Sequence, residues 1–311
     1  MGKASERYEV IHSIVTSKEN ILKIADLCDT AGVSRSGYYY WLSTEEDRKL
    51  REEKDKKDFE LILEAYKFKG YDKGIRGIHM RLLHLDKPVL MNIKKIRRLM
   101  NKYNLRCTIR SANPYRRMAK ALKTDLICDN LLNRKFKEFG PRKVLLTDIT
   151  YIPLNDGFCY LSVIKDAYTK QILAYVLSDS LEIDFVLETV KLLINNHGIS
   201  LDEETLIHSD QGCHYTSKKF RTIINNCKLR QSMSRKGNCW DNAPQESFFW
   251  HMKDEIGEKI RLCSTYAEVK ALIDDWMDYY NNYRYQWDLA KLSPNEYYAY
   301  ITTGIYPLKI K

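Results

Sequence analysis

The sequence predicts an α/β domain built on a mixed five-stranded sheet over residues 142–260, preceded by small all-α units. Three apolar runs separated by short polar turns, at 143–154, 158–165 and 171–177, are typical of an antiparallel meander. After them, helical apolar periodicity alternates with two more short apolar runs, which adds strands and helices in turn. Upstream of residue 108 the apolar spacing follows the helical repeat instead.

Composition narrows the class of protein. The 311-residue chain is 44% hydrophobic, enough for a buried core, and its formal charge of +10 fits a polyanionic partner or simple solubility. The eight cysteines form no CxxC pair and no zinc motif with the histidines, so we expect free thiols in a reducing cytosol. No run approaches the roughly 20 apolar residues of a membrane span, and the N-terminus has no apolar signal core. These features predict a cytoplasmic protein without a membrane partner.

Residues 1–48 show the pattern of a helix, a glycine-containing turn and a second helix. Ser34 is placed to cap the second helix, and Arg35 falls in its first turn. This pattern resembles a helix-turn-helix, in which the second helix contacts DNA; a plain helical hairpin is the alternative. The charges of both signs in residues 44–58 predict a solvated helix or a linker.

Residues 59–107 predict a second small helical unit with its own apolar faces. Breaks at 70–74 and 86–88 divide it, and its last helix is expected over 92–103. The following residues, 108–141, are expected to form a basic linker, because their polar content argues against a core.

Local signals place the elements of the α/β domain. Asn155-Asp156-Gly157 predicts a tight turn between the first two strands. Ser180 is expected to cap a helix that ends at Gly198, and Thr216 or Ser217 to begin the next.

Residues 261–311 predict a helical extension of this domain. Thr265 and Glu268 have the spacing of a capping box at the start of a long helix. Ser293-Pro294 is typical of the start of a last short helix.

Three carboxylates carry the chemistry that the sequence predicts. Asp148 lies within the apolar run of the first strand, Asp210 ends a short apolar run, and Glu246 falls in the first turn of a helix. A charge in a buried strand is costly unless it is paired or bound to a cation. Hard divalent cations prefer carboxylate oxygens, and two such ions suit phosphoryl transfer. We therefore expect Asp148, Asp210 and Glu246 to bind two metal ions, with Lys253 on the same helix face holding a phosphate.

Other polar residues near these acids have simpler interpretations. Asp166 is expected to cap a turn, and Asp241 to cap the helix of Glu246. His208 and His214, on either side of Asp210, are expected to support that carboxylate; a zinc or acid–base role is the alternative.

A basic tract predicts contact with nucleic acid. Residues 91–123 hold five Lys and six Arg and no acidic residue, and eleven unopposed charges favour phosphates over a merely solvated face. Arg235 and Lys236, in the loop before the helix of Glu246, form a second candidate for phosphate contact. The alternative for this loop is a mobile polar segment without a role in binding. With Arg35 and Lys253, the expected DNA contacts are Lys94, Lys95, Arg97, Arg98, Arg116, Arg117, Arg235 and Lys236.

Several separated motifs together resemble the retroviral-integrase-type catalytic core, and within it the second-frame (orfB-type) transposase of two-frame bacterial insertion sequences. The motifs are TDITYI at Asp148, HSDQGCHYTS at Asp210 and GNCWDNAPQESFFWHMKDE at Glu246, with NLLNR before the core and YYNNYRYQ and LSPNEY after it. The 35 residues between Asp210 and Glu246 match the family spacing, and Lys253 stands where the family carries a basic residue. The resemblance spans roughly residues 60 to 300.

The resemblance implies a ribonuclease-H-like core and a transposase that cuts and joins DNA at Asp148, Asp210 and Glu246. It implies Mg²⁺ as cofactor, with Mn²⁺ as a substitute. The implied partners are double-stranded DNA, as the terminal inverted repeats of the element and a target, a second copy of the chain, and an upstream-frame protein as partner or fusion. A bacterial, nucleoid-associated protein would follow. Two alternatives stay open: a non-catalytic helix-turn-helix protein or inactive remnant, and a ribonuclease-H-like nuclease acting on hybrids or junctions.

Overall fold

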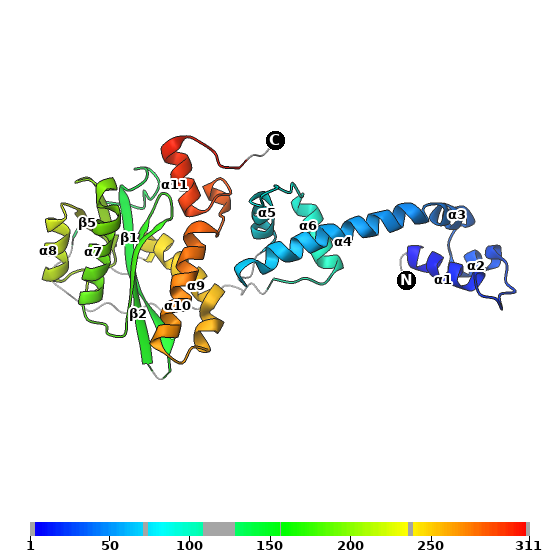
Figure 1. Cartoon of the computed structure of the whole chain (residues 1–311), viewed down its shortest axis with the longest axis horizontal. Coiled ribbons are helices and arrows are strands. Elements are labelled where there is room, and N and C mark those ends of the chain that lie inside the picture. The colour runs from blue at the N-terminus through cyan, green and yellow to red at the C-terminus, as the bar shows by residue number, and fades with distance from the viewer. Residues whose placement is uncertain (1–3, 71–73, 108–127, 156, 236–238, 309–311) are drawn as a thin grey trace. The chain divides into compact units, whose positions relative to one another are not determined.

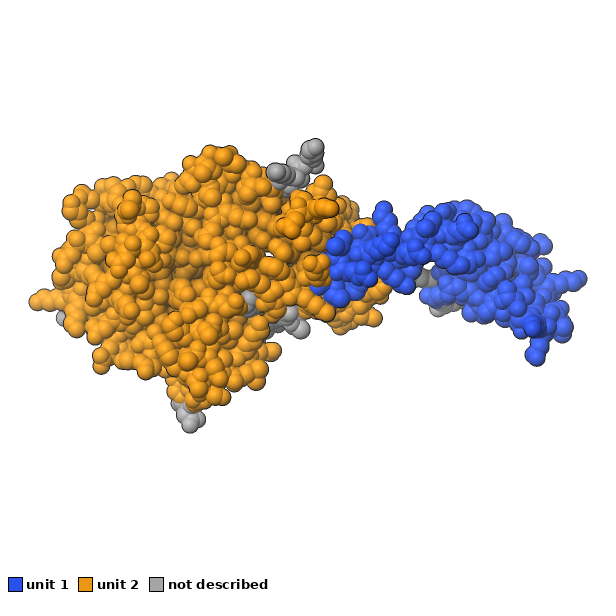
Figure 2. All heavy atoms as spheres, in the orientation of Figure 1, with its two compact units in different colours: residues 1–63 blue, residues 64–311 orange. Residues whose placement is uncertain are grey.

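A computed structural model describes residues 4–70, 74–107, 128–155, 157–235 and 239–308 of the chain. Two compact units divide it at residue 63, and Figure 2 colours them separately. The division falls inside α4 (Glu45–Lys67). This helix includes almost all of the charged segment 44–58, for which the sequence predicted a solvated helix or a linker. Acidic residues in the first turn of α4 suit the positive end of the helix dipole.

The N-terminal unit is helical, as the sequence predicted. Its first three helices are α1 (Ala4–Val15), α2 (Ile24–Ala31) and α3 (Arg35–Ser43). Gly32 ends α2 with a φ of 62°, a conformation that glycine adopts without strain. The Ser34 hydroxyl then accepts a hydrogen bond from the Gly37 amide and caps α3. Ile11, Leu27 and Tyr38 are buried between the three helices.

The second unit begins with a small helical part. After the end of α4 come the 3₁₀ turn η1 (Phe68–Gly70), α5 (Ile75–Leu83) and α6 (Ile93–Lys102). The Asn92 side chain accepts a hydrogen bond from the Lys94 amide at 2.8 Å and caps α6 where the sequence predicted a helix. Ile78 on α5 and Ile96 and Leu99 on α6 are fully buried.

The predicted five-stranded mixed sheet is confirmed (Figure 1). Its strands are β1 (Val144–Leu154), β2 (Gly157–Asp166), β3 (Ile172–Ser178), β4 (Leu206–Ser209) and β5 (Arg230–Met233). They lie in the order β3-β2-β1-β4-β5. The pairs β1/β2 and β2/β3 are antiparallel and form the meander, whereas β1/β4 and β4/β5 are parallel. A parallel pair needs a crossover connection, and helices supply it here.

One face of the sheet packs against α7 (Asp184–His197) and α8 (Lys218–Asn226). The Ser217 hydroxyl accepts from the Phe220 amide and begins α8 as expected. Ser180, in contrast, is not the cap of α7, which starts four residues after it. Its hydroxyl accepts from the Glu182 amide in a local turn instead, and α7 has no side-chain cap.

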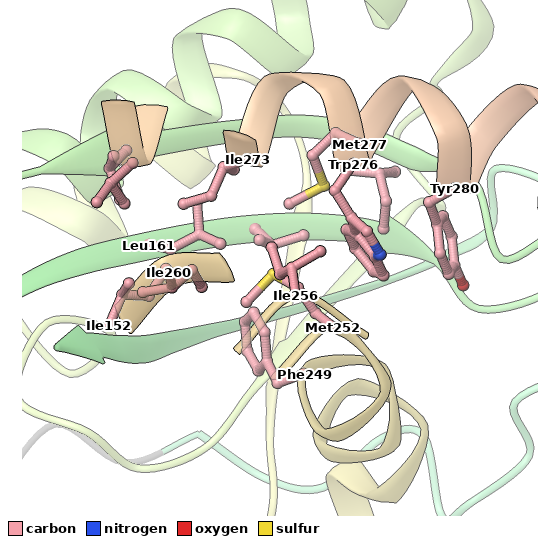
Figure 3. Close-up of a cluster of buried hydrophobic side chains, with 14 of the residues drawn as sticks. Ile152, Leu161, Phe249, Met252, Ile256, Ile260, Ile273, Trp276, Met277 and Tyr280 are labelled. Atoms are coloured by element: carbon pink, nitrogen blue, oxygen red, sulfur yellow. The ribbon is translucent and has the colours of Figure 1, made fainter. Parts of the chain in front are cut away.

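The opposite face packs against α9 (Ala243–Arg261) and α10 (Tyr266–Asn282). Figure 3 shows the core between them, where side chains of both helices meet those of the central strands. Trp276 and Phe248 lie here with ring centroids 5.5 Å apart. Trp276 is fully buried, and its indole N–H donates to Glu255 at 2.9 Å, so its one polar atom is satisfied.

The predicted capping box of Thr265 and the predicted helix start at Ser293-Pro294 are confirmed, and the second also proves to be a capping box. Thr265 and Glu268 form one at the start of α10, and Ser293 and Glu296 form the other at the start of α11 (Pro294–Thr303). The short 3₁₀ turns η2 (Gly198–Ser200), η3 (Cys239–Asn242) and η4 (Trp287–Leu289) complete the elements. Among the described residues, every helix is too short or too polar to cross a membrane.

Candidate active site

Asp148 and Asp210 occupy equivalent places on adjacent parallel strands. Leu146 of β1 pairs with His208 of β4, and the same register continued by two residues places Asp148 beside Asp210. Side chains alternate along a strand, so both carboxylates belong to the sheet face of Ile152, which α9 and α10 cover. Neighbouring strands are about 4.8 Å apart. The two acids are therefore neighbours, Asp148 within β1 and Asp210 directly after the end of β4.

Glu246 reaches this face from the first turn of α9. Two hydrogen bonds attach the beginning of this helix to the sheet. Asn242 Nδ2 donates to the carbonyl of Thr147 at 3.4 Å, and the Lys165 ammonium donates to the carbonyl of Pro244. Thr147 immediately precedes Asp148, so the attachment holds the first turn of α9, with Glu246, near Asp148. The helix dipole favours a carboxylate in a first turn.

Electrostatics indicate that the three acids share one region with Lys253. Burial raises the pKa of Asp148 well above its usual range, and the negative charges of Asp210 and Glu246 raise it further. The Ile149 amide, which donates to Asp148 at 2.8 Å, and the charge of Lys253 act in the opposite direction. Desolvation also raises the pKa of Asp210. A carboxylate pair that resists ionisation is a setting in which a cation is strongly favoured.

The three acidic side chains influence one another electrostatically, but they are not arranged as the ligands of one metal ion. Over the described ranges, the structure contains no group of three His, Cys, Asp or Glu side chains arranged to hold a metal ion. Asp148, Asp210 and Glu246 therefore share an electrostatic environment, and their joint metal binding stays a prediction.

The loop after Asp210 is shaped by a close approach of glycine. The Gly212 amide donates to Asp210 Oδ1 at 2.9 Å, and a β-carbon at residue 212 would meet the same oxygen at 2.9 Å. Any larger residue would therefore press on the carboxylate. The Gln211 side chain donates to the carbonyl of Ser234 at 3.0 Å and ties this loop to the end of β5.

His208 and His214 have separate structural partners. His208 is buried between the hydroxyls of Ser232 at 2.9 Å and Ser234 at 3.1 Å, and burial lowers its pKa to about 4. A neutral His208 thus links β4 to β5. His214 Nε2 lies 2.6 Å from the carbonyl of Leu181 and so joins the loop after Asp210 to the segment before α7.

Asp241 is the centre of a polar network, and its expected role as a helix cap is wrong. Asn242 occupies the cap position, and Asp241 is fully buried. Its carboxylate accepts from Arg235, Arg134 and Asn130, each at 2.8 Å. The bonds to the two guanidinium groups, Arg235 first, hold the pKa of Asp241 well below its usual range. The network joins the segment before β1 to the segment that leads into α9.

Asp166 has the turn-capping role that the sequence predicted. Its Oδ1 accepts from the Tyr168 amide at 2.9 Å, and its Oδ2 pairs with Arg142 at 3.1 Å. Both Asp166 and Arg142 are buried, so this ion pair closes the β2–β3 turn and has no access to a ligand.

Sequence reasoning did not identify Lys165 or Arg134. Lys165 faces Leu146 across the β1–β2 pair, and it is only 2% exposed although it reads as an ordinary polar residue near a strand end. Arg134 lies 107 positions from Asp241 in the chain. The signal that would have found Lys165 is its place in an apolar strand that pairs with the strand of Asp148.

The predicted DNA contacts lie on several elements. Arg35 is exposed in the first turn of α3, Lys94, Arg97 and Arg98 are exposed on α6, and Lys95 is half-buried. Lys253 is exposed on α9, and its charge acts on Asp148. The guanidinium of Arg235 is engaged with Asp241. Arg116, Arg117 and Lys236 lie outside the described residues.

Comparisons with known proteins identify the family of this chain. Residues 139–239 match a family model for the integrase core domain, and residues 227–294 match a second model with the same description. The chain is 30% identical over 270 residues to a 31 kDa protein of insertion element IS600 from Shigella sonnei, covering 86% of this chain and 96% of the relative. It is 30% identical over 276 residues to the putative transposase InsK of insertion sequence IS150 from Escherichia coli, covering 88% and 92%. The catalytic core of BIV integrase aligns with 52% of this chain and 97% of its own, at 15% identity and a TM-score of 0.42.

The mixed sheet with helices on both faces is a ribonuclease-H-like core of the integrase class. The chain belongs to the second-frame (orfB-type) transposases of bacterial insertion sequences.

Proposed function

We propose that the protein cleaves DNA at the ends of its insertion sequence and joins them to a target, using divalent metal ions held by Asp148, Asp210 and Glu246. The observation that carries this proposal is the parallel β1/β4 register, whose continuation sets Asp148 beside Asp210 beneath the attached first turn of α9. Three rigid elements thus supply one acid each, as a preorganised site requires.

The donor set fits hard divalent cations such as Mg²⁺ or Mn²⁺. Carboxylate oxygens are the ligands these ions prefer, and the set includes no thiolate or imidazole. Asp148, Asp210 and Glu246 repel one another, and a bound cation would relieve this repulsion. Bound there, two such ions would activate the attacking oxygen and stabilise the leaving oxygen of a phosphodiester.

The residues of the chain would position the DNA. Lys253, seven residues after Glu246 and on the same face of α9, would hold the scissile phosphate or its neighbour. The Asn242 and Lys165 contacts keep the first turn of α9 in place while the strand binds. Water would be the first nucleophile and the freed 3′-hydroxyl the second, both attacking phosphorus directly, so no side chain needs to form a covalent link to DNA.

The remaining parts would deliver the DNA. The helical segments 1–48 and 59–107 would bind the terminal inverted repeats, assisted by the basic linker 108–141. The core 142–260 with its extension 261–311 would act on the bound end. Positive charge on α6 supports this assignment. We also propose that copies of the chain act together on DNA, alone or with an upstream-frame protein.

An end-cleavage assay tests the proposal. The full chain is incubated with duplexes carrying an end of its own element, with a DNA–RNA hybrid of the same sequence, and with each of Mg²⁺, Mn²⁺ and EDTA. We expect strand cleavage next to the element end and transfer to a second duplex, only with divalent metal. Cleavage confined to the hybrid would indicate a ribonuclease instead, and binding without any cleavage would indicate a DNA-binding protein.

A further inference from the structure

An open, basic cavity of about 460 Å³ lies beside the first two turns of α9. Pro244, Ser247 and His251 line it from α9, on the side of the helix turned away from Glu246 and Lys253. The segment before β1 and the ends of β2 and α10 form the other walls. The cationic side chains that line it are Arg134, Lys135, Lys137, Lys165, Lys170 and Arg284.

These cations exceed the carboxylates available to them. Lys137 and Lys170 share Asp288, at 3.5 Å and 2.6 Å. Arg134 shares Asp241 with Arg235, which lies outside the cavity wall. Positive charge is therefore left over, and the cavity is electrostatically suited to an anion.

Two further ion pairs show which lining cation is already neutralised by the protein and which can still contact a ligand. Arg284 forms a partly buried pair with Glu255 at 2.8 Å, so its charge is compensated inside the protein. Lys135 pairs with Glu138 at 2.9 Å, but both side chains are more than half exposed. Pairs of that kind are weak and exchange partners readily.

Lys165 is the most unusual of the six. It is 2% exposed, donates to the carbonyl of Pro244, and has no carboxylate partner in the described part of the chain. Burial, with a smaller effect of the charge of Lys170, lowers its pKa to about 7. A buried ammonium without a counter-ion is costly, and an anion bound in the cavity would offset that cost.

We propose that this cavity binds a backbone phosphate of the DNA strand that is cut, one or more nucleotides away from the phosphate at Glu246. The inference rests on the proposed function for the identity of the ligand. Lys165 supplies a buried donor at the wall, whose charged form a bound phosphate would stabilise, and Lys135 and Lys137 supply exposed charges at the segment before β1. A strand held at both the cavity and Lys253 would be fixed on two sides of α9.

The salt dependence of DNA binding tests this proposal. Each phosphate contact contributes about 0.7 for a single strand, or about 0.9 for duplex DNA, to the slope of log affinity against log salt concentration. The full chain is titrated with a duplex end and with a single strand, in EDTA, so that binding is measured without cleavage. Because the cavity is proposed to hold one phosphate, we expect Lys135→Ala/Lys137→Ala to reduce the magnitude of the slope by about 0.7 to 0.9, and Lys165→Met by up to the same amount.

The matched control is Lys219→Ala/Lys228→Ala. These lysines are also exposed and paired, with Asp184 and Glu203, but they belong to the region of α8 on the other face of the sheet. The slope of log affinity against log salt concentration for this double variant should equal that of the unchanged chain. An unchanged slope in Lys135→Ala/Lys137→Ala, or an equal reduction in the control, would overturn the proposal, even if Lys165→Met failed to fold.

A competition arm distinguishes DNA phosphate from a free anion. Inorganic pyrophosphate, added at constant ionic strength, should displace DNA only weakly from the unchanged chain. Pyrophosphate binding that depends on Lys135 and Lys137, together with an unchanged DNA slope, would assign the cavity to a small anion and defeat the DNA inference. Because no cleavage is measured, these outcomes are independent of whether Asp148, Asp210 and Glu246 perform the chemistry.

Discussion

Replacing Asp148 by Asn should reduce metal-dependent strand cleavage and joining by more than about a hundredfold while the protein stays folded and still binds DNA. Loss of a partner that only orients a metal ligand already costs about 10- to 100-fold, and Asp148 is proposed to be a ligand itself. The substitution preserves shape and removes one of two neighbouring negative charges. The measurement is the rate of end cleavage and strand transfer at saturating Mg²⁺.

Thermal stability gives the same variant a second readout. Without divalent metal, Asp148→Asn relieves repulsion from Asp210 and Glu246, so the fold should be as stable as before or up to about 1 kcal/mol more stable. For a domain of this size that corresponds to a rise in Tm of about 2–4 °C. Stabilisation by added Mg²⁺ should become smaller than in the unchanged chain.

The control for Asp148→Asn is Asp184→Asn. Asp184 is an exposed acid on α7, which packs on the opposite face of the sheet, and its replacement should change neither cleavage nor the response to metal. Cleavage by Asp148→Asn at the rate of the control would contradict the proposed role of Asp148.

Replacing Trp276 by Ala should have the largest effect on folding, a loss of about 3–5 kcal/mol in the free energy of unfolding. Trp276 is fully buried in the core between α9, α10 and the sheet, beside Tyr280 (Figure 3). Its ring also packs against that of Phe248. The substitution leaves a large cavity and also removes the hydrogen bond to Glu255. Urea unfolding followed by circular dichroism measures the loss.

Trp240 supplies a control of the same residue type. It is 68% exposed, and Trp240→Ala should change the free energy of unfolding by no more than about 0.5 kcal/mol. If both variants lost similar stability, the α9–α10 core would not be the main support of the sheet face that carries Asp148.

Local chemistry explains what the sequence predicted well. Ser34, Ser217, Thr265 and Ser293 cap helices with their own side chains, so a few consecutive residues determine where each helix begins. The meander was predictable for the same reason, because strand alternation and turn residues are read locally. The prediction that Ser180 caps a helix was wrong because an exposed serine can accept from a nearby amide in a turn as well as begin a helix.

Long-range contacts explain what the sequence did not reveal. Asp241 looked like a helix cap because its partners Arg134 and Asn130 are more than a hundred residues away. Lys165 looked like an ordinary strand-end lysine, and only the pairing of β2 with β1 shows that it is buried beside α9. The candidate site was partly accessible, because the motifs named Asp148, Asp210 and Glu246, but the register that places Asp148 beside Asp210 depends on which strands pair.

The most direct test of the shared metal site is anomalous X-ray scattering from crystals of the full chain grown with Mn²⁺. The account predicts manganese bound by the carboxylates of Asp148 and Asp210, with Glu246 completing the site once DNA is bound, and loss of this manganese in Asp148→Asn. An intact sheet with manganese bound elsewhere, or with none near Asp148 and Asp210 even in the presence of DNA, would contradict it.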